Sequence, residues 1–314
     1  MAQKNCEVVV VSDLDAKRLA DVSSLYPSVR TTSDASDIFG NPSLDAVVIA
    51  TPVDTHFGLA MAALKAGKHV LVEKPMASSS DQVRQMIDEA ESRGLVLMVD
   101  HTFVYTGAVR KMRELVLDSA FGELNYYDST RVNLGLFQHD VNVLWDLAVH
   151  DLSIMSYVLG ETPLAVSATG QSRTPGQPQY AAYLTVFFND AIAHINVNWL
   201  SPVKVRRTLV GGNRKMIVYD DLSSTEKIRL YDKGISVSES PEDIRKMLVS
   251  YRTGDMWSPK LDETEALETE IKHFLECIER GMVPITGGEQ ALQLIRILEA
   301  ADESLGRRGA PQEV

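Results

Sequence analysis

The stretch that decides the fold is residues 46–75, AVVIATPVDTHFGLAMAALKAGKHVLVEKP. It holds two short apolar runs, 46–50 and 69–73, separated by an amphipathic segment, 55–66, that ends at Gly67. Short β-branched runs on either side of such a segment predict a strand, a helix and a second strand. Because parallel strands need a crossover of about this length, the unit predicts a parallel sheet covered by helices.

The same alternation continues on both sides of this stretch. Apolar runs at 7–12 and 95–99 predict two further buried strands, and the segments 15–26 and 80–93 have the spacing of amphipathic helices. The run 7–12 carries four consecutive valines, a pattern typical of a strand with a neighbour on each side. Strands that alternate with helices in this way predict an α/β domain built on a doubly wound parallel sheet.

The pattern changes near residues 105–125. A helix is predicted over 140–159, and the strands that follow succeed one another without helices: 166–171, 180–188, 191–199, 204–210 and 216–220. Consecutive strands predict an α+β domain with a mostly antiparallel sheet. Helices at 265–280 and 288–305 close the chain. We therefore expect a parallel-sheet domain over 1–115, an α+β domain over 116–285, and a C-terminal helix within 286–314 that packs back on the first domain.

The composition is that of an ordinary globular protein, with 45% hydrophobic and 24% charged residues among 314. The net charge of −12 disfavours nucleic acid and anionic lipid as partners. Cys6 and Cys277 cannot build a disulfide framework, which favours a reducing cytoplasm. No apolar run reaches the ~18 residues of a membrane helix, and residues 1–5 carry no apolar signal core. The sequence predicts a cytoplasmic protein without a membrane partner.

An acidic residue, Asp13, follows the predicted strand 7–12. In dinucleotide-binding folds, a carboxylate at this position accepts hydrogen bonds from the adenosine ribose and favours NAD over NADP. The alternative is that Asp13 or Asp15 only caps the next helix. On position alone the two interpretations are about equally supported, so Asp13 is a candidate ribose ligand.

The glycine-rich loop that belongs to such a fold lies about 20 residues before the acidic residue. Only 12 residues precede Asp13, and no two of the 19 glycines have the G-x-G spacing. The expected sheet is therefore an incomplete Rossmann-like one that lacks its central strand, and this loss should break the sheet in two. Three explanations compete: a start written downstream of the true one, which we favour, a natural truncation, or a fold that binds no dinucleotide.

Polar segments follow three predicted strands: Ala50-Thr51-Pro52 with Thr55-His56, Glu73-Lys74-Pro75, and Asp100-His101-Thr102. The carboxyl ends of parallel strands meet at one edge of a sheet, where ligands bind. Pro75 restricts the backbone of Lys74 to extended conformations, so the ammonium group is expected to have a defined direction. The alternative is an ordinary surface lysine at the end of a strand.

Asp146 and His150 are four residues apart on the predicted helix 140–159, so they lie on one face. A carboxylate beside an imidazole raises its proton affinity and orients it, which suits a general base near neutral pH. The alternative is an ordinary helix pair worth a few tenths of a kcal/mol. The histidines show no metal-like spacing with cysteines or carboxylates, so no metal site is predicted.

Together, Ala50-Thr51-Pro52 with Thr55-His56, Glu73-Lys74-Pro75 and Asp146 with His150-Asp151 resemble the Gfo/Idh/MocA family of NAD(P)-dependent oxidoreductases, the glucose–fructose oxidoreductase and inositol dehydrogenase group. The resemblance covers nearly the whole chain. Residues 101–110 and 133–150 are most similar to members that act on nucleotide sugars. Asp100 departs from the family, which often has a small residue there.

The resemblance implies transfer of a hydride from a secondary hydroxyl of a sugar or nucleotide sugar to NAD, with NADP left open. Lys74 would stabilise the developing alkoxide, His150 would take the hydroxyl proton, and Asp146 would orient His150 or bind a sugar hydroxyl. The implied cofactor contacts are Asp13, Thr51, Pro52, His56, Glu73 and Lys74, and the substrate-contact candidates are Tyr105, Arg131, Asn133 and Asn142.

The resemblance also implies a homo-oligomer formed through the exposed face of the second-domain sheet. A second function stays open beside the enzyme: a non-catalytic sugar-sensing or scaffold protein of the same fold that has lost cofactor binding. The missing glycine loop motivates this alternative.

Overall fold

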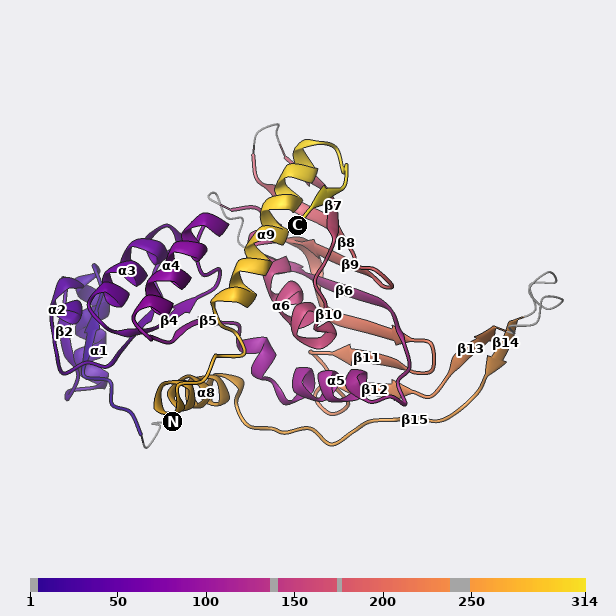
Figure 1. Cartoon of the computed structure of the whole chain (residues 1–314), viewed down its shortest axis with the longest axis horizontal. Coiled ribbons are helices and arrows are strands. Elements are labelled where there is room, and N and C mark those ends of the chain that lie inside the picture. Colours follow the sequence, from indigo (N-terminus) through magenta and orange to yellow (C-terminus); the bar gives the residue numbers. More distant parts are fainter. Residues whose placement is uncertain (1–4, 136–140, 174–176, 238–248) are drawn as a thin grey trace. The chain divides into compact units, whose positions relative to one another are not determined.

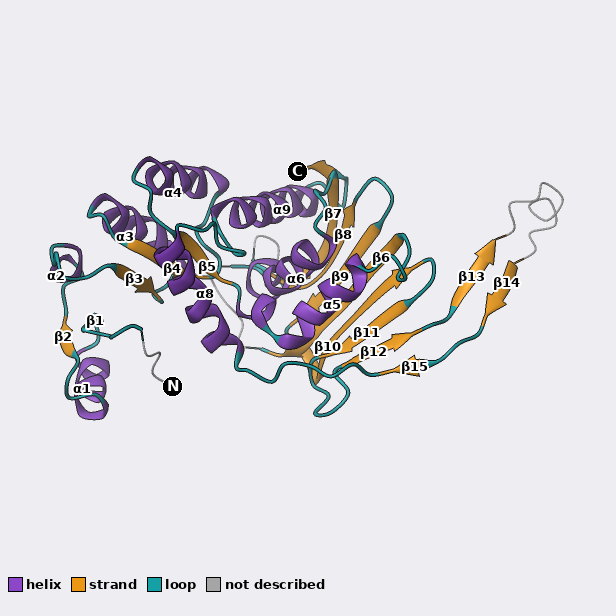
Figure 2. Ribbon diagram, turned by 60° about the horizontal axis from the view of Figure 1, so that its bottom comes forward, coloured by secondary structure: helices purple, strands orange, loops and turns teal. Residues whose placement is uncertain are grey.

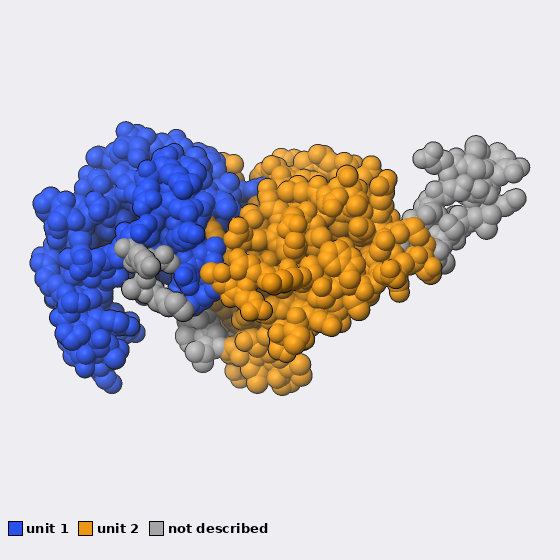
Figure 3. All heavy atoms as spheres, turned by 90° about the horizontal axis from the view of Figure 1, so that it is seen from below, with its two compact units in different colours: residues 1–102, 265–295 blue, residues 103–264, 296–314 orange. Residues whose placement is uncertain are grey.

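The computed structural model describes residues 5–135, 141–173, 177–237 and 249–314 (Figure 1). Contacts divide the chain into two compact units, coloured in Figure 3. Unit 1 comprises Met1–Thr102 and Glu265–Ile295, and unit 2 comprises Phe103–Thr264 and Arg296–Val314. This division differs from the expected 1–115, 116–285 and 286–314, because the chain returns to unit 1 twenty residues before 285.

Hydrogen bonds to β5 (Leu97–Asp100) explain that return. The backbone N–H of Val99 donates to Thr286 O at 2.9 Å, and Thr286 Oγ1 donates to Val99 O at 2.8 Å. These bonds attach α8 (Ala266–Arg280) and the first turns of α9 (Gly288–Gly306) to unit 1. The rest of α9 belongs to unit 2. Pairing between segments nearly 190 residues apart leaves no local pattern in the sequence.

The centre of unit 1 is a parallel sheet of β3 (Ala46–Ile49), β4 (His69–Glu73) and β5, in that order. The crossovers are α3 (Val53–Lys65) and α4 (Ser80–Ser92). Val70 and Val72 of β4 are fully buried, as is Leu64 of α3. The βαβ unit predicted from residues 46–75 is thus confirmed, and its apolar runs form the core.

A second, separate sheet holds β1 (Val10–Ser12) and β2 (Arg30–Thr32), with α1 (Ala16–Leu25) and α2 (Ser36–Phe39) beside them. No described residue bridges β1 to β3, so the expected break in the sheet is confirmed. The prediction of a buried strand over 7–12 was wrong about burial: Val8 is 62% and Val9 40% exposed, and the part that forms a strand, Val10–Ser12, is half-buried. Among the described residues, β2 is the only strand that pairs with β1, so no second strand covers Val8 and Val9.

Unit 2 is built on a nine-stranded sheet in the order β15-β12-β11-β10-β6-β9-β8-β7-β16. All its pairings are antiparallel except that of β6 with β9. The strands are β6 (Leu124–Leu134), β7 (Ala165–Ser172), β8 (Gln179–Phe187), β9 (Ile192–Asn198), β10 (Leu200–Gly212), β11 (Met216–Asp220), β12 (Ile228–Tyr231), β15 (Met256–Trp257) and β16 (Gln312–Glu313). The predicted α+β second domain is confirmed.

Helices α5 (Gly107–Leu117) and α6 (Val149–Leu159) lie against one face of this sheet (Figure 2). Alternate residues of the strands point into that layer, as in β8, where Ala182, Leu184 and Val186 are buried. A 3-10 turn, Thr102–Tyr105, precedes α5, and a separate hairpin pairs β13 (Gly234–Val237) with β14 (Val249–Arg252). Within the described residues, no helix is both long and apolar enough to cross a membrane.

The helix predicted over 140–159 differs from the structure in one respect. Its first residue, Asp140, lies outside the described residues, and the helix starts as a π-helical turn, η2 (Leu144–Ala148), before α6. The N–H of Val149 reaches Leu144 O, five residues back, which is the hydrogen bond that defines a π turn. Gly160 ends α6 with a left-handed φ of 68°.

Candidate active site

Lys74 leaves the sheet directly at the end of β4. Its backbone N–H donates to Glu73 Oε2 at 3.1 Å, and the Lys74–Pro75 peptide bond is cis. Met76 and Ala77, which follow, are 1% and 0% exposed. The segment is therefore anchored on both sides of Lys74, by a buried strand before it and buried side chains after it.

Two carboxyl groups from neighbouring strands flank this point. Glu73 and Asp100 are register partners at the ends of β4 and β5. Asp100 Oδ1 accepts hydrogen bonds from the N–H and the hydroxyl of Thr102. Burial raises the pKa of Glu73, and the charge of Asp100 adds to the rise. The predicted convergence of strand-end polar groups at one edge thus holds for these two strands.

A third carboxyl group comes from α8. Glu270 is fully buried, and burial together with Asp100 raises its pKa to about 9. Sequence reasoning missed this residue. The signal was present, since Glu270 occupies the same helix face as buried Phe274 and Cys277 at helical spacing. We refer to Glu73, Asp100 and Glu270 as the carboxyl cluster.

His101 lies beside this cluster and is 3% exposed. Burial lowers its pKa to about 4, and the positive charge of Lys74 acts in the same direction. Its ring is therefore neutral near pH 7. Lys74 consequently stands among carboxyl groups and a neutral imidazole.

Glu270 makes the stability of the protein depend on pH. Its folded-state pKa of about 9 lies above the value of 4.5 for a free carboxyl, so the folded state holds a proton that the unfolded state releases in between. Stability should fall as pH rises through this window. We expect Glu270→Gln to remove that fall and to stabilise the protein at pH 8 by about 2–4 kcal/mol. Urea unfolding at pH 5 and pH 8 measures the difference.

The control for this prediction is Glu279→Gln, an exposed glutamate on the same helix, which should leave the pH dependence as in the unaltered protein. If Glu270→Gln and the unaltered protein lose stability in parallel between pH 5 and pH 8, the buried carboxyl is ionised in the folded state and the prediction is wrong.

Asp13 stands at the end of β1, as expected. Its Oδ1 accepts the N–H of Asp15 at 2.8 Å, and its Oδ2 lies 3.4 Å from Arg18 Nη1. These contacts lower the pKa of Asp13. Asp15 is the residue that caps α1, through the N–H of Lys17. The cap and the candidate ribose ligand are thus two different residues.

His56, one of the predicted cofactor contacts, lies in the interior of unit 1. It is 1% exposed, and its ring lies between two backbone carbonyl oxygens, Thr51 O at 2.7 Å from Nε2 and Pro75 O at 2.9 Å from Nδ1. Both nitrogens are therefore used inside unit 1. His56 joins the segment after β3 to the segment that carries Lys74. Thr51 and Pro52 are exposed at the start of α3, with Thr51 Oγ1 2.7 Å from Thr55 Oγ1.

Asp146 and His150 lie on consecutive turns of η2 and α6 in unit 2. Asp146 Oδ2 accepts a hydrogen bond from the indole of Trp199 at 2.9 Å. The ring of His150 meets Phe103 edge-on, with 5.1 Å between ring centroids. Both side chains are half-buried. π turns of this kind recur at functional sites, because the extra residue redirects side chains that a regular helix would align differently.

The four predicted substrate contacts differ in solvent exposure and in the partners of their side chains. Arg131 is 3% exposed and forms an ion pair with Asp151, Nε to Oδ2 at 2.5 Å, so its guanidinium belongs to the interior of unit 2. Tyr105 is also 3% exposed. Asn142 uses its amide within the fold, as described below. Asn133 lies on β6 and is half-buried. The substrate contacts predicted for these four residues stay predictions.

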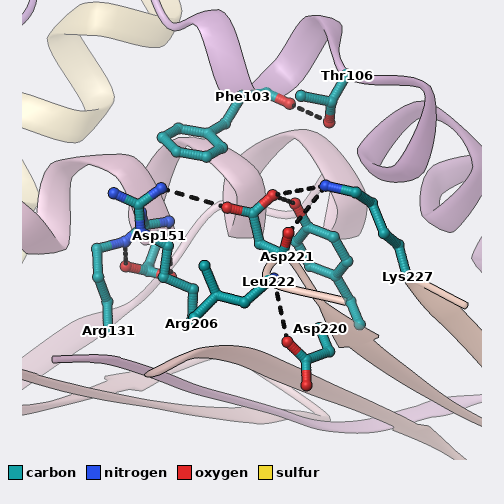
Figure 4. Close-up of polar contacts among 10 residues, drawn as sticks. Phe103, Thr106, Arg131, Asp151, Arg206, Asp220, Asp221, Leu222 and Lys227 are labelled. Carbon is teal, nitrogen blue, oxygen red and sulfur yellow. Dashed lines mark hydrogen bonds and ion pairs between the residues drawn. The ribbon is translucent and has the colours of Figure 1, made fainter. Parts of the chain in front are cut away.

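A polar network missed by sequence reasoning extends from Arg131 (Figure 4). The guanidinium carbons of Arg131 and Arg206 lie 4.5 and 5.5 Å from the centroid of Phe103. Asp221 accepts from Arg206 at 3.3 Å and from the Lys227 ammonium at 3.4 Å. Because these residues come from separate strands and a turn, no local motif marks them. The network fixes Phe103, the ring against which His150 rests.

The comparisons with known proteins agree with this architecture. Residues 1–101 match the model of an oxidoreductase family with an NAD-binding Rossmann fold, and residues 109–218 match that of the GFO/IDH/MocA C-terminal domain. The chain is 27% identical to UDP-N-acetylglucosamine 3-dehydrogenase of Acidithiobacillus ferrooxidans, over 85% of this chain and 80% of that enzyme. It is 24% identical to inositol 2-dehydrogenase of Rhizobium meliloti, over 97% and 91% of the two chains.

Two solved structures show the same fold. UDP-N-acetylglucosamine 3-dehydrogenase of Acidithiobacillus ferrooxidans has a TM-score of 0.80 at 23% identity, covering 96% of this chain and 90% of the other. Levoglucosan dehydrogenase, in complex with NADH and levoglucosan, has a TM-score of 0.81 at 19% identity, over 98% and 91%. The two family models together place the chain in an oxidoreductase family with an NAD-binding Rossmann fold. The chain belongs to the Gfo/Idh/MocA family, which confirms the resemblance found in the sequence.

Proposed function

We propose that this protein is a dehydrogenase that oxidises a secondary hydroxyl of a sugar, polyol or nucleotide sugar with a nicotinamide cofactor. The observation that carries the proposal is Lys74, held between buried segments at the end of β4 beside the carboxyl cluster. The names of the relatives support the substrate class, since they include a nucleotide-sugar dehydrogenase and an inositol dehydrogenase.

The described residues fit a nicotinamide dinucleotide at two points. Asp13, at the end of β1, offers a carboxylate for the adenosine ribose, and Glu73 with Lys74 offers polar groups at the end of β4. The Asp13 carboxylate favours NAD over NADP, with the exposed Arg18 beside it leaving NADP open. No G-x-G spacing in the chain provides the usual backbone cradle for the pyrophosphate.

In this proposal each residue has one task. A bound nicotinamide would supply the acceptor for the hydride of the carbinol carbon. The ammonium of Lys74 stabilises negative charge as it develops on the carbinol oxygen. His150 takes the hydroxyl proton as general base, and Asp146, fixed by Trp199, holds the orientation of the turn that carries His150. Among the described residues, no group of three His, Cys, Asp or Glu could hold a metal ion.

Binding and turnover test the proposal separately. NADH and NADPH are titrated into the protein and their fluorescence is followed. NAD and NADP are then supplied with a panel of inositols, aldoses and UDP-sugars, and nicotinamide reduction is followed by absorbance. Turnover of at least one member of the panel is the expected result. Absence of turnover with every member, although NADH binds, would overturn the dehydrogenase proposal.

The alternative is a sugar-sensing or scaffold protein of the same fold that has lost cofactor binding. The observation that favours it is the break between β1 and β3. The titration separates the two functions, because a sensor of this kind binds a sugar and neither nucleotide. Micromolar binding of NADH or NADPH would remove this alternative.

We also propose that the protein works in the cytoplasm as a homo-oligomer assembled through the nine-stranded sheet. Cys6 and Cys277 are both free thiols, as expected in a reducing compartment. Side chains such as Tyr183, which is 64% exposed on β8, lie on the sheet face that the helices leave uncovered. Sedimentation of the unaltered protein and of Tyr183→Glu should show an oligomer that the charge dissociates. A monomer in both cases would contradict this assembly.

A further inference from the structure

The residues that lead into His150 are tied to a distant carboxylate. We call residues 142–150 the π-turn segment. Asn142 caps it, since its Oδ1 accepts the N–H groups of Leu144 at 3.0 Å and Trp145 at 3.3 Å. The other end of the same amide, Nδ2, donates to Asp302 Oδ1 at 2.6 Å.

The second oxygen of Asp302 is used as well. Trp145 Nε1 donates to Asp302 Oδ2 at 2.7 Å, so one carboxylate on α9 receives donors from two side chains at the start of the π-turn segment. Asp302 lies about 160 residues further along the chain. Asp302 is exposed, yet each of its carboxylate oxygens accepts a hydrogen bond, and both donors belong to the π-turn segment.

The sheet holds the segment from its other side. Trp199, which is 1% exposed at the end of β9, donates its indole N–H to Asp146 Oδ2 at 2.9 Å. Val143, Leu144 and Ala148 are buried as well. A π turn is rare because its hydrogen bonds are less favourable than those of an α-helix, so it persists where surrounding contacts hold it. Asp302 and Trp199 are such contacts.

We propose that Asp302 is a positioning residue for the proposed general base: it holds Asn142 and Trp145, and through them the π turn that sets the positions of Asp146 and His150. This inference rests on the proposed dehydrogenase function. Misplacement of a reacting group by ~1 Å can lower a rate by as much as ~10²-fold. Loss of one of two hydrogen bonds should displace the turn less than this, so we expect a fall in kcat of roughly 10-fold.

The test uses Asp302→Asn, which keeps the shape of the side chain but turns one acceptor oxygen into an NH2 group that faces a donor. The double variant Asp302→Asn with Asn142→Asp exchanges the two groups and restores the pairing: the carboxylate at 142 still caps the segment, and the amide at 302 donates to it and accepts from Trp145. Glu303→Gln, at a neighbouring exposed position of α9, is the matched control.

Two measurements are made on the full-length variants. Hydrogen exchange followed by mass spectrometry reports the protection of amides in residues 143–150 without any substrate. Steady-state kinetics on a substrate found in the panel separates kcat from KM. We expect Asp302→Asn to exchange faster in this segment and to lose roughly 10-fold in kcat with a smaller change in KM. The exchanged pair should recover the protection of these amides, and Glu303→Gln should match the unaltered protein in both measurements.

Each other outcome overturns the inference. Unchanged exchange in Asp302→Asn shows that Asp302 does not hold the segment, whatever the activity. Faster exchange with unchanged kcat shows that the turn need not be held for catalysis. Fast exchange that persists in the exchanged pair shows that the pairing of residues 142 and 302 is not the cause. An unaltered protein that binds NADH but turns over nothing removes the dehydrogenase function, and the positioning role falls with it.

Discussion

Replacing Lys74 by alanine should lower kcat by ~10²-fold or more, on the scale of lost electrostatic or proton-transfer assistance. The physical reason is the charge that develops on the carbinol oxygen as its proton and then a hydride leave. An ammonium placed beside that oxygen lowers the energy of the transition state more than that of the bound alcohol. Steady-state kinetics on the best substrate of the panel measures kcat and KM for both proteins.

Two further variants identify the cause of the loss. Lys74→Met retains a long apolar stem without the charge, so it should be as impaired as Lys74→Ala. Lys65→Ala removes an exposed lysine in the last turn of α3 and should have no effect. NADH affinity should change much less than kcat in the Lys74 variants. Turnover by Lys74→Ala at the unaltered rate would exclude Lys74 from the mechanism.

Replacing Arg131 by methionine should lower the free energy of unfolding by about 3–5 kcal/mol. The Arg131 and Asp151 side chains are 3% and 4% exposed, and their ion pair joins β6 to α6. Removal of the guanidinium leaves the Asp151 carboxylate buried without its partner, which is far more unfavourable than losing the pair as a whole. Urea unfolding of the two proteins at one pH measures the difference.

An exposed pair in the same unit provides the contrast. Lys111 and Glu114 are three residues apart on α5, and the Glu114 side chain is 68% exposed. Lys111→Met should therefore change the free energy of unfolding by less than about 1 kcal/mol. The double variant Arg131→Met with Asp151→Leu should regain much of the stability lost by Arg131→Met alone. Equal effects of Arg131→Met and Lys111→Met would show that the Arg131 pair contributes no more than a surface contact.

The valine run and the π turn show why sequence prediction succeeded for some elements and failed for others. The runs 46–50 and 69–73 became β3 and β4 because both have partners in the sheet. The run 7–12 is also rich in valine, yet its first valines are exposed. The reason is that the burial of a strand depends on its neighbours in the fold and not on its own residues alone. The π turn was missed because helical periodicity differs little between a π turn and an α-helix over five residues.

Among the predicted site residues, too, local sequence determined the position of some, and contacts within the fold determined the surroundings of others. Lys74, Glu73 and Asp13 stand at strand ends, where the alternation of strands and helices placed them. Arg131 and His56 were predicted as ligand contacts from the family resemblance alone, and the structure shows in addition that their side chains are bonded within the fold. Glu270 and Asp302 were not predicted at all, because each acts on residues more than 150 positions away.

By itself, the sequence determined the strand–helix alternation over residues 46–99, the run of strands over 166–220, the family, and the break in the parallel sheet, because these follow from local periodicity, short motifs and the absence of a glycine loop. It did not predict α5 or β6, the strand at the centre of the nine-stranded sheet. Only the tertiary structure decided which charges are buried, which carboxyl group holds its proton, and which residues support the turn that carries His150. Those properties depend on the solvent exposure and the neighbours of each side chain, and both are set by contacts between segments far apart in the chain.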